Sequence, residues 1–128
     1  MSYVRIEKPR PGTSVIVMDR PERMNSMAFE LVVPLHEALA QVAADNETGV
    51  VVLTGTGRGF CSGADTQESE PPPNIAGLTL TRIAPRAMSI LADLAPALRR
   101  LPQPVIAAVN GAAIGGGLGP APGGAHRI

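Results

Sequence analysis

The sequence has few aromatic residues and no excess of charge of either sign. It holds no tryptophan, one tyrosine and two phenylalanines among 128 residues, and its formal net charge is zero. Proteins that bind nucleic acids stack bases on aromatic side chains and attract phosphates with an excess of basic residues. We therefore expect neither a nucleic acid nor a membrane surface as a partner.

Cysteine and long apolar runs are also scarce. The single cysteine, Cys61, excludes an internal disulfide and fits a reducing compartment. No stretch approaches the roughly 20 apolar residues that are needed to cross a bilayer, and the first ten residues contain no signal-like apolar run. These observations predict a cytoplasmic protein.

The two histidines and the cysteine offer little for metal or nucleophilic chemistry. His36 and His126 lie far apart in the sequence and have no partners at ligand spacing, so no metal site is expected. We expect His36 to be a solvated or half-buried helix residue. Because no histidine stands in a companion motif, Cys61 is expected to be a small buried side chain rather than a nucleophile.

Four segments have the composition of β-strands. A turn at residues 9–12 separates the first two and predicts an N-terminal hairpin. The third is an uninterrupted apolar run, so it is expected to be buried on both faces. These segments are residues 3–8, 13–18, 50–54 and 105–109.

Two further segments carry apolar residues at helical spacing. The first begins at its expected N-cap, Asn25 or Ser26, and contains Pro34, which should kink the helix or delay its start. The second covers residues 80–101 and is interrupted by two prolines. Residues 66–78, between them, are expected to form an exposed, mobile loop. The order of strands and helices predicts an α/β fold, compatible with repeated ββα units.

Two glycine-rich loops, residues 55–65 and 109–117, follow the third and fourth strands. Glycine lets a backbone approach a ligand closely and aim its N–H groups at an anion. The first loop fails the dinucleotide-binding fingerprint because Phe60 stands at the final glycine position, and no Gly-Lys-Ser/Thr phosphate loop is present. Two N–H groups, one from each loop, that converged on one carbonyl oxygen would form an oxyanion hole.

Three motifs together are similar to the enoyl-CoA hydratase/isomerase (crotonase) family. They are residues 20–26, 58–65 and 104–117, and their order and spacing extend the resemblance from about residue 15 to residue 118. The resemblance implies a crotonase-like spiral of repeated ββα units that is incomplete at its C-terminal end. It also implies an acyl-CoA thioester as the substrate, with no separate cofactor.

The resemblance assigns roles to residues in each motif. The backbone N–H groups of Ala64 and Gly116 match the two oxyanion-hole donors, which would polarise the thioester carbonyl. Arg20 and Arg58 are expected either to meet the phosphates of coenzyme A or to lie in solvent. The positions that match coenzyme A-binding positions of the family are Met24, Ser26, Ser62, Ala64, Asp65, Thr66, Gly115 and Gly116.

The sequence departs from the family pattern after Leu118. Gly119 stands where family hydratases have one catalytic carboxylate, and the second carboxylate position lies beyond residue 128. Residues 119–128 are rich in glycine and proline and cannot sustain the helix that the family has there. We therefore expect a family-like part, residues 1–118, and an unrelated tail in a truncated or frameshifted product.

The departures leave three functions open. The chain is an active lyase or isomerase that takes its carboxylates from elsewhere, a pseudoenzyme that binds coenzyme A without turnover, or a non-catalytic interaction fragment. Family subunits form trimers or hexamers, and such an assembly is expected only for a full-length chain.

Overall fold

The computed structural model describes residues 2–61, 77–110, 112–113 and 126–127. Its larger sheet has five strands in the order β1-β2-β3-β5-β7. The first pair is antiparallel and every other neighbouring pair is parallel, which confirms the α/β class and the N-terminal hairpin. The strands are β1 (Val4–Arg10), β2 (Thr13–Met18), β3 (Val50–Gly55), β5 (Val105–Ala108) and β7 (His126–Arg127).

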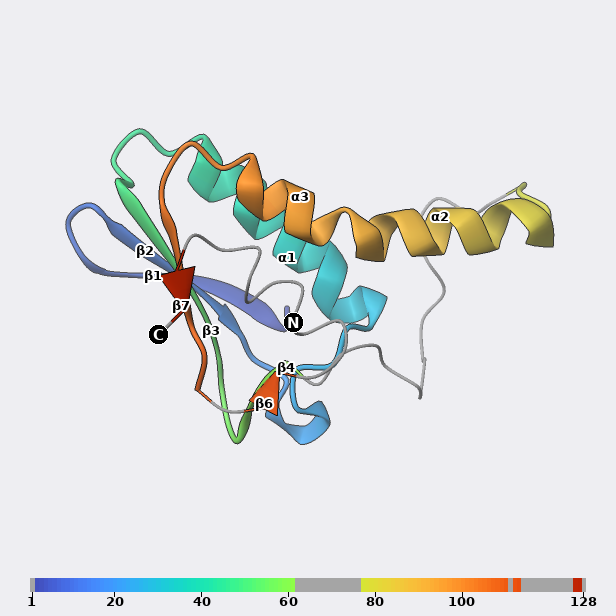
Figure 1. The fold of residues 1–128 in the computed structure, drawn as a ribbon, viewed down its shortest axis with the longest axis horizontal. Helices are drawn as coiled ribbons and strands as arrows, with labels where there is room; N and C mark the ends of the chain where they lie inside the picture. Colours follow the sequence, from blue (N-terminus) through green and yellow to red (C-terminus); the bar gives the residue numbers. More distant parts are fainter. Residues whose placement is uncertain (1, 62–76, 111, 114–125, 128) are drawn as a thin grey trace.

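The helices lie in the connections between the parallel strands. Parallel neighbours require such crossovers, because the chain must return to the same end of the sheet before the next strand begins. In Figure 1, α1 and α3 lie together over one face of the sheet, whereas α2 extends outward beyond it. The helices are a short 3-10 helix η1 (Pro21–Arg23), α1 (Phe29–Ala43), α2 (Leu80–Ala92) and α3 (Leu94–Arg99).

The hydrophobic core fills the space between the larger sheet and the helices α1 and α3. One stripe of α1 is buried, including Leu31 and Leu35, and it meets Leu53 of β3 and Leu94 of α3 in one cluster. Full burial of such a side chain contributes about 1.5–3 kcal/mol. This packing holds α1 against the sheet and thereby fixes the loops on either side of the helix.

A second, two-stranded sheet lies at the end of the first. Its strands are β4 (Gly59–Cys61) and β6 (Ala112–Ala113), which pair in parallel. Each follows closely on a strand of the larger sheet, β4 after β3 and β6 after β5. The sequence analysis predicts only loops here, because strands of two or three residues among glycines carry no periodic pattern.

Two expectations for the strands are wrong in detail. β1 continues through Pro9 to Arg10, which an edge strand tolerates because its outward N–H groups have no partner. β3 alternates half-buried and buried residues rather than being buried on both faces. The run is apolar because both faces of the strand carry apolar or β-branched residues, one face in the core and the other only half-buried.

The helices also differ from the prediction. The N-cap of α1 is Ala28, not Asn25 or Ser26, and Pro34 lies inside an unbroken helix. The predicted helix of residues 80–101 is divided at Asp93. This division puts Pro96 in the first turn of α3, where a missing N–H costs nothing.

The predicted loop, residues 66–78, and the predicted tail, residues 119–128, are only partly covered by the described residues. Of the predicted loop, residues 66–76 lie outside the described residues. In the predicted tail, β7 pairs in parallel with β5, which joins Ile106 to His126 in register. The sequence analysis predicts no strand in that segment.

Candidate functional site

The candidate site lies at the carboxyl ends of β2, β3 and β5. Ligands of parallel α/β sheets bind outside these ends, because the loops that follow the strands converge there. The loop after β2 carries η1, the turn after β3 leads into β4, and the loop after β5 leads into β6. Figure 1 shows β4 and β6 together at this end of the larger sheet.

Asn25 joins the loop after β2 to the turn after β3. Its backbone has a positive φ of 53°, which asparagine tolerates better than most residues, and its side chain is fully buried. The Oδ1 atom accepts a hydrogen bond from the backbone N–H of Arg20 at 2.8 Å. The Nδ2 group donates to the carbonyls of Thr56, Gly59 and Phe60 at 3.1, 3.0 and 3.2 Å.

Asn110 joins the loop after β5 to the same turn. Its Nδ2 group donates to the carbonyl of Gly57 at 2.9 Å and to the carbonyl of Gly59 at 3.2 Å. The Gly59 carbonyl therefore accepts hydrogen bonds from two amide side chains that come from two different loops. Three strand ends are held together at this one oxygen.

Gly55 makes room for this network. A Cβ atom at this position would lie 2.6 Å from Asn25 Nδ2 and 2.7 Å from the carbonyl oxygen of Phe60. Real Cβ atoms do not approach other atoms so closely, so only glycine fits without a shift of the backbone.

The pairing of β4 with β6 determines where the two segments that follow these strands begin. Cys61, the last residue of β4, is in register with Ala113, the last residue of β6. Because the strands are parallel, the two following segments leave the same edge of this small sheet. The predicted donors Ala64 and Gly116 come three residues after these two positions. They lie outside the described residues, as do Ser62, Asp65, Thr66 and Gly115.

Met24 and Ser26 are the predicted binding residues that the structure describes. Met24 has a left-handed backbone and packs over Gly59, where an added Cβ would lie 3.2 Å from the Met24 Cε atom. Ser26 is buried, and its carbonyl accepts a hydrogen bond from the N–H of Ala28 at 3.0 Å. Both residues thus belong to the loop after β2, and their contact with coenzyme A stays a prediction.

Arg20 is buried, so the expectation that it lies in solvent is wrong. Only 6% of the residue is exposed, and its guanidinium stacks on the ring of Tyr3 at 4.5 Å. Its nitrogens lie 3.5 Å from the Glu30 carboxylate and 3.8 Å from that of Glu22. Two carboxylates already balance its charge, and it ties the loop after β2 to α1. Arg58, by contrast, is exposed.

Asn25, Asn110 and Gly55 carry no predicted site role. A local reading makes Asn25 an N-cap, because asparagine has that preference near a helix start. The three carbonyls to which its Nδ2 group donates belong to residues 31 to 35 positions away in the sequence. The available signal is that both asparagines stand within motifs that carry the family resemblance.

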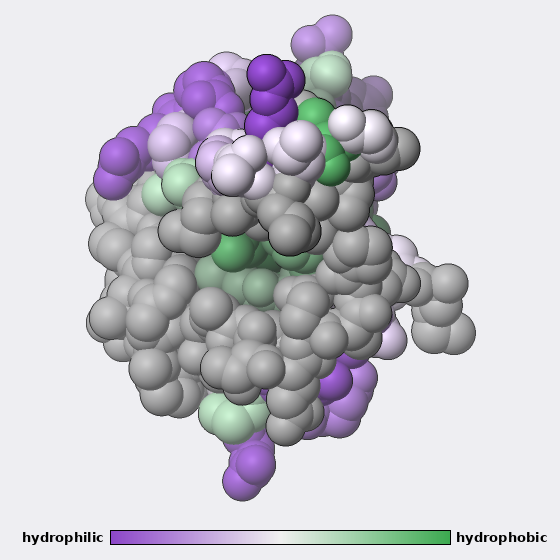
Figure 2. All heavy atoms as spheres, turned by 90° about the vertical axis from the view of Figure 1, so that its right-hand side faces the viewer, coloured by the Kyte–Doolittle hydropathy of each residue, from purple (hydrophilic) through white to green (hydrophobic). Residues whose placement is uncertain are grey.

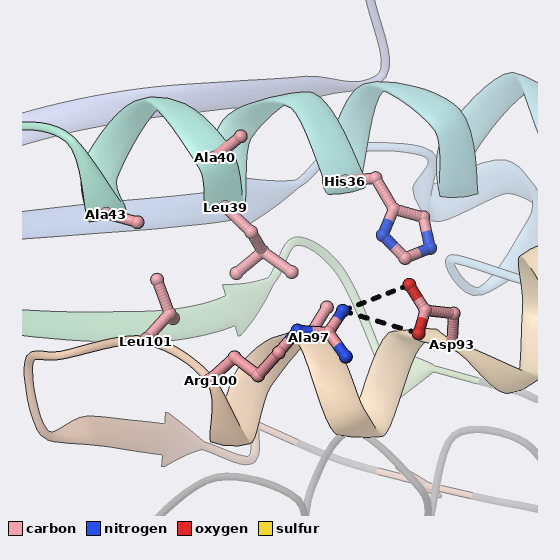
Figure 3. A pocket seen from close by; sticks show the side chains of 8 residues that line it. All are labelled: His36, Leu39, Ala40, Ala43, Asp93, Ala97, Arg100 and Leu101. Carbon is pink, nitrogen blue, oxygen red and sulfur yellow. Dashed lines mark hydrogen bonds and ion pairs between the residues drawn. The ribbon is translucent and has the colours of Figure 1, made fainter.

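A separate hollow of about 290 Å³ lies between α1 and α3 (Figure 3). His36 is half-buried here, as predicted, and a ring nitrogen lies 3.0 Å from the carbonyl of Ile90. Arg100 and Asp93 form an exposed ion pair at 3.2 Å. None of the predicted site residues lines this hollow, whose lining is His36, Leu39, Ala40, Ala43, Asp93, Ala97, Arg100 and Leu101.

Further candidates for a site are the surface, the cysteine and the possible metal ligands. Viewed from the side toward which α2 extends, hydrophobic residues are visible near the centre of this face (Figure 2). Cys61 is a fully buried cysteine that forms no disulfide, and its burial is as predicted. The described part of the chain holds no cluster of three or more His, Cys, Asp or Glu residues that could bind a metal. No helix among the described residues has the length and apolar character to span a bilayer.

Comparison with known proteins gives consistent matches. The family model "Enoyl-CoA hydratase/isomerase" matches residues 10–121. A probable enoyl-CoA hydratase of Mycobacterium tuberculosis is 58% identical over 118 residues, which are 92% of this chain and 41% of the relative. The 1,2-epoxyphenylacetyl-CoA isomerase of Escherichia coli is 41% identical over 109 residues, 83% of this chain and 39% of that protein.

Solved structures match as well. A probable enoyl-CoA hydratase/isomerase from Mycobacterium abscessus superposes with a TM-score of 0.90 at 48% identity, over 98% of this chain and 46% of that one. The predicted crotonase-like fold is thereby confirmed for the part of it that the chain covers. The chain spans about 41% of the length of the curated relative from M. tuberculosis. It belongs to the enoyl-CoA hydratase/isomerase family.

Proposed function

We propose that the chain binds an acyl-CoA thioester at the carboxyl ends of β2, β3 and β5. The backbone N–H groups of Ala64 and Gly116 would donate hydrogen bonds to the thioester carbonyl oxygen. The observation that carries the proposal is the parallel register of Cys61 with Ala113. It starts the two donor segments side by side, and three residues of chain reach at most about 10 Å from there.

Two such donors would stabilise the charge that grows on the carbonyl oxygen in an enolate-like transition state. Backbone N–H groups suit this role because a folded loop fixes their direction before the substrate arrives. Removal of one donor typically costs about 3–4 kcal/mol of transition-state stabilisation. The names of two relatives, a probable enoyl-CoA hydratase and a 1,2-epoxyphenylacetyl-CoA isomerase, both refer to thioesters of coenzyme A, which supports this substrate class. The thioester is itself the substrate, and no other cofactor is proposed.

We propose lyase or isomerase chemistry on this thioester by family resemblance. The second candidate, binding and polarisation without turnover, is the one that we expect of the 128-residue chain itself, because Gly119 stands at the position where the family resemblance implies a carboxylate. Without a general acid or base, an oxyanion hole alone does not deliver a proton to the substrate carbon.

Further parts of the proposal rest on the family resemblance. Met24, Ser26, Ser62, Asp65, Thr66 and Gly115 would line the coenzyme A channel together with the two donors. A cytoplasmic location, and a trimer or hexamer of a full-length chain, are proposed on the same ground.

A chromophoric thioester tests the carbonyl polarisation directly. The absorption of a dialkylaminocinnamoyl-CoA moves to longer wavelength when hydrogen bonds draw electrons toward its carbonyl oxygen. We expect the chain to bind this probe with such a red shift. Replacement of Gly116 by proline removes one N–H and should abolish most of the shift. A thioether analogue without the carbonyl should still bind.

The controls separate the candidate functions. Gly124→Pro makes the same replacement beyond the proposed site and should leave the shift unchanged, and circular dichroism reports whether each variant folds. If Gly116→Pro is unfolded, Ala64→Pro tests the other donor. Binding without any red shift contradicts the oxyanion hole. Absence of binding supports the interaction fragment, and a red shift without turnover supports the pseudoenzyme.

A further inference from the structure

We infer that Asn110 and Asn25 are positioning residues for the acyl-CoA site, which they set through the carbonyl of Gly59. The inference rests on the proposed function and adds to it the groups that hold the two donor segments in register. Neither side chain is assigned a contact with substrate, so both act through the backbone.

The first step is the place of Gly59 in the fold. Gly59 opens β4 and is in register with Ala112, which opens β6. Asn110 precedes Ala112 by two residues, and its Nδ2 group donates to the Gly59 carbonyl at 3.2 Å. The loop that leads into β6 therefore holds the first residue of β4 with its own side chain. This contact fixes the residues at which the pairing of β4 with β6 begins, Gly59 and Ala112.

The second step is the contribution of Asn25 from the loop after β2. Its Nδ2 group lies 3.0 Å from the same carbonyl and 3.2 Å from the carbonyl of Phe60, the next residue of β4. Its Oδ1 atom is occupied by the N–H of Arg20. A buried amide with both ends bonded cannot rotate without losing bonds that water cannot replace. Asn25 thus holds β4 from the loop after β2, while Asn110 holds it from the loop that leads into β6.

The two asparagines differ in exposure, and this difference makes the inference testable. Asn25 is fully buried, so its replacement would disturb folding and local geometry together. Asn110 is exposed and contributes no core packing. Its amide group acts through two hydrogen bonds to Gly57 and Gly59. Replacement of Asn110 should therefore weaken the hold of the loop after β5 on β4 without removing any side chain from the core.

The experiment compares Asn110→Asp and Asn110→Ala with the unaltered chain, using the dialkylaminocinnamoyl-CoA probe. In the Asp variant a carboxylate oxygen replaces the N–H donor and repels the two carbonyls at nearly unchanged volume. The Ala variant only removes the bonds. We expect both variants to lose most of the red shift, the Asp variant more, while they keep the affinity for free coenzyme A and the circular dichroism spectrum. Asn46→Asp, at another exposed asparagine, is the matched control and should keep the full shift.

Each outcome decides a separate question. If the unaltered chain shows no red shift, the proposed oxyanion hole fails, irrespective of Asn110. If the unaltered chain shifts the probe and both Asn110 variants retain the full shift, the positioning role is refuted. If both variants unfold, it is refuted as well, because Asn110 would then act on stability. Return of the shift in Asn110→Gln, whose amide can still donate, would support the inference further.

Discussion

At the residue scale, Gly55 shows how closely the backbone packs around the site. We expect Gly55→Ala to destabilise the chain by about 1–3 kcal/mol, the usual range for overpacking. The reason is the approach of the new methyl group to Asn25 Nδ2 and to the carbonyl of Phe60, at 2.6 and 2.7 Å. Urea unfolding followed by circular dichroism measures the loss. Gly49→Ala is the control, since its Cβ would meet only the Gly12 carbonyl, at an ordinary 3.6 Å. Equal losses in both variants would contradict the expected crowding.

Asp45 makes the stability of the chain depend on pH in the acid range. A hydrogen bond from Lys8 Nζ at 2.7 Å, with further bonds from the Glu47 N–H and the Thr48 hydroxyl, lowers the pKa of Asp45 to about 2. A carboxylate whose pKa is lower in the folded state contributes stability above its unfolded pKa of about 3.9. That contribution is lost as the pH falls through the folded value.

We therefore expect Asp45→Asn to be less stable than the unaltered chain at neutral pH. The difference should shrink below about pH 4 and vanish near the folded pKa, because both proteins then carry a neutral group at this position. Urea unfolding across the acid range measures it. Glu37→Gln is the control, because Glu37 is exposed and takes part in none of the ion pairs found in the described ranges. A difference that stays constant down to pH 2 would show that charge is not its cause.

Single residues were predictable where local chemistry decides their environment. Burial of Cys61 and half-burial of His36 follow from the ordinary behaviour of these side chains and are confirmed. The burial of Arg20 was not predictable, because Tyr3, just before β1, and Glu30, in α1, pack against its guanidinium from other parts of the chain. A loop arginine between polar residues gives no sign of such partners.

At the scale of the elements, Pro34 stands in the second turn of α1 without breaking it. Proline there removes the N–H that would bond to the carbonyl of Glu30, and in a helix interior it costs about 3 kcal/mol relative to alanine. Its rigidity in the unfolded chain offsets up to about 1 kcal/mol of that. We expect Pro34→Ala to raise the free energy of unfolding by about 1–2 kcal/mol.

Pro96→Ala provides the comparison for this prediction. Pro96 lies in the first turn of α3, where the N–H of an alanine would have no helical partner. This variant should not gain stability, and urea unfolding of both measures the contrast. A larger gain for Pro96→Ala than for Pro34→Ala would show that the missing hydrogen bond is not what limits α1.

Element types were predictable and element boundaries less so. β-branched runs and helical spacing indicate every long strand and helix among the described residues. Interruptions were expected at both prolines of residues 80–101, but Pro85 lies inside an unbroken α2 and the one division falls at Asp93, three residues before Pro96. β4 and β6 were missed because their pairing depends on side-chain bonds from Asn25 and Asn110 rather than on their own composition.

At the scale of the whole molecule, β3 pairs with β5 in parallel. This pairing directs the chain after both strands toward the same end of the sheet, which an oxyanion hole built from two loops requires. The pairing of β7 with β5 was not predicted, because glycine and proline dominate the composition of residues 119–128 and conceal a two-residue strand. The positions of Ala64 and Gly116, outside the described residues, stay predictions.

We expect the 128-residue chain to hydrate crotonyl-CoA no faster than a buffer blank. Hydration needs a general base for the water and a general acid for the neighbouring carbon, and each contributes about 10²–10⁴-fold. Gly119 has no side chain with which to act as either. A steady-state absorbance assay measures the rate. Turnover above the blank that disappears in Gly116→Pro would show that the chain obtains acid–base groups from other residues.

The meeting of two asparagines at the Gly59 carbonyl also has a kinetic consequence. The residues that it joins are 34 and 51 positions apart in the sequence, so these bonds close long loops, and both are in place only after β2, β3 and β5 lie side by side. Bonds absent from the folding transition state govern the unfolding rate and leave the folding rate unchanged. In stopped-flow experiments Asn110→Ala should therefore accelerate unfolding while refolding proceeds at its normal speed. The strand ends that hold the site would be the last part of the molecule to form and the first to open.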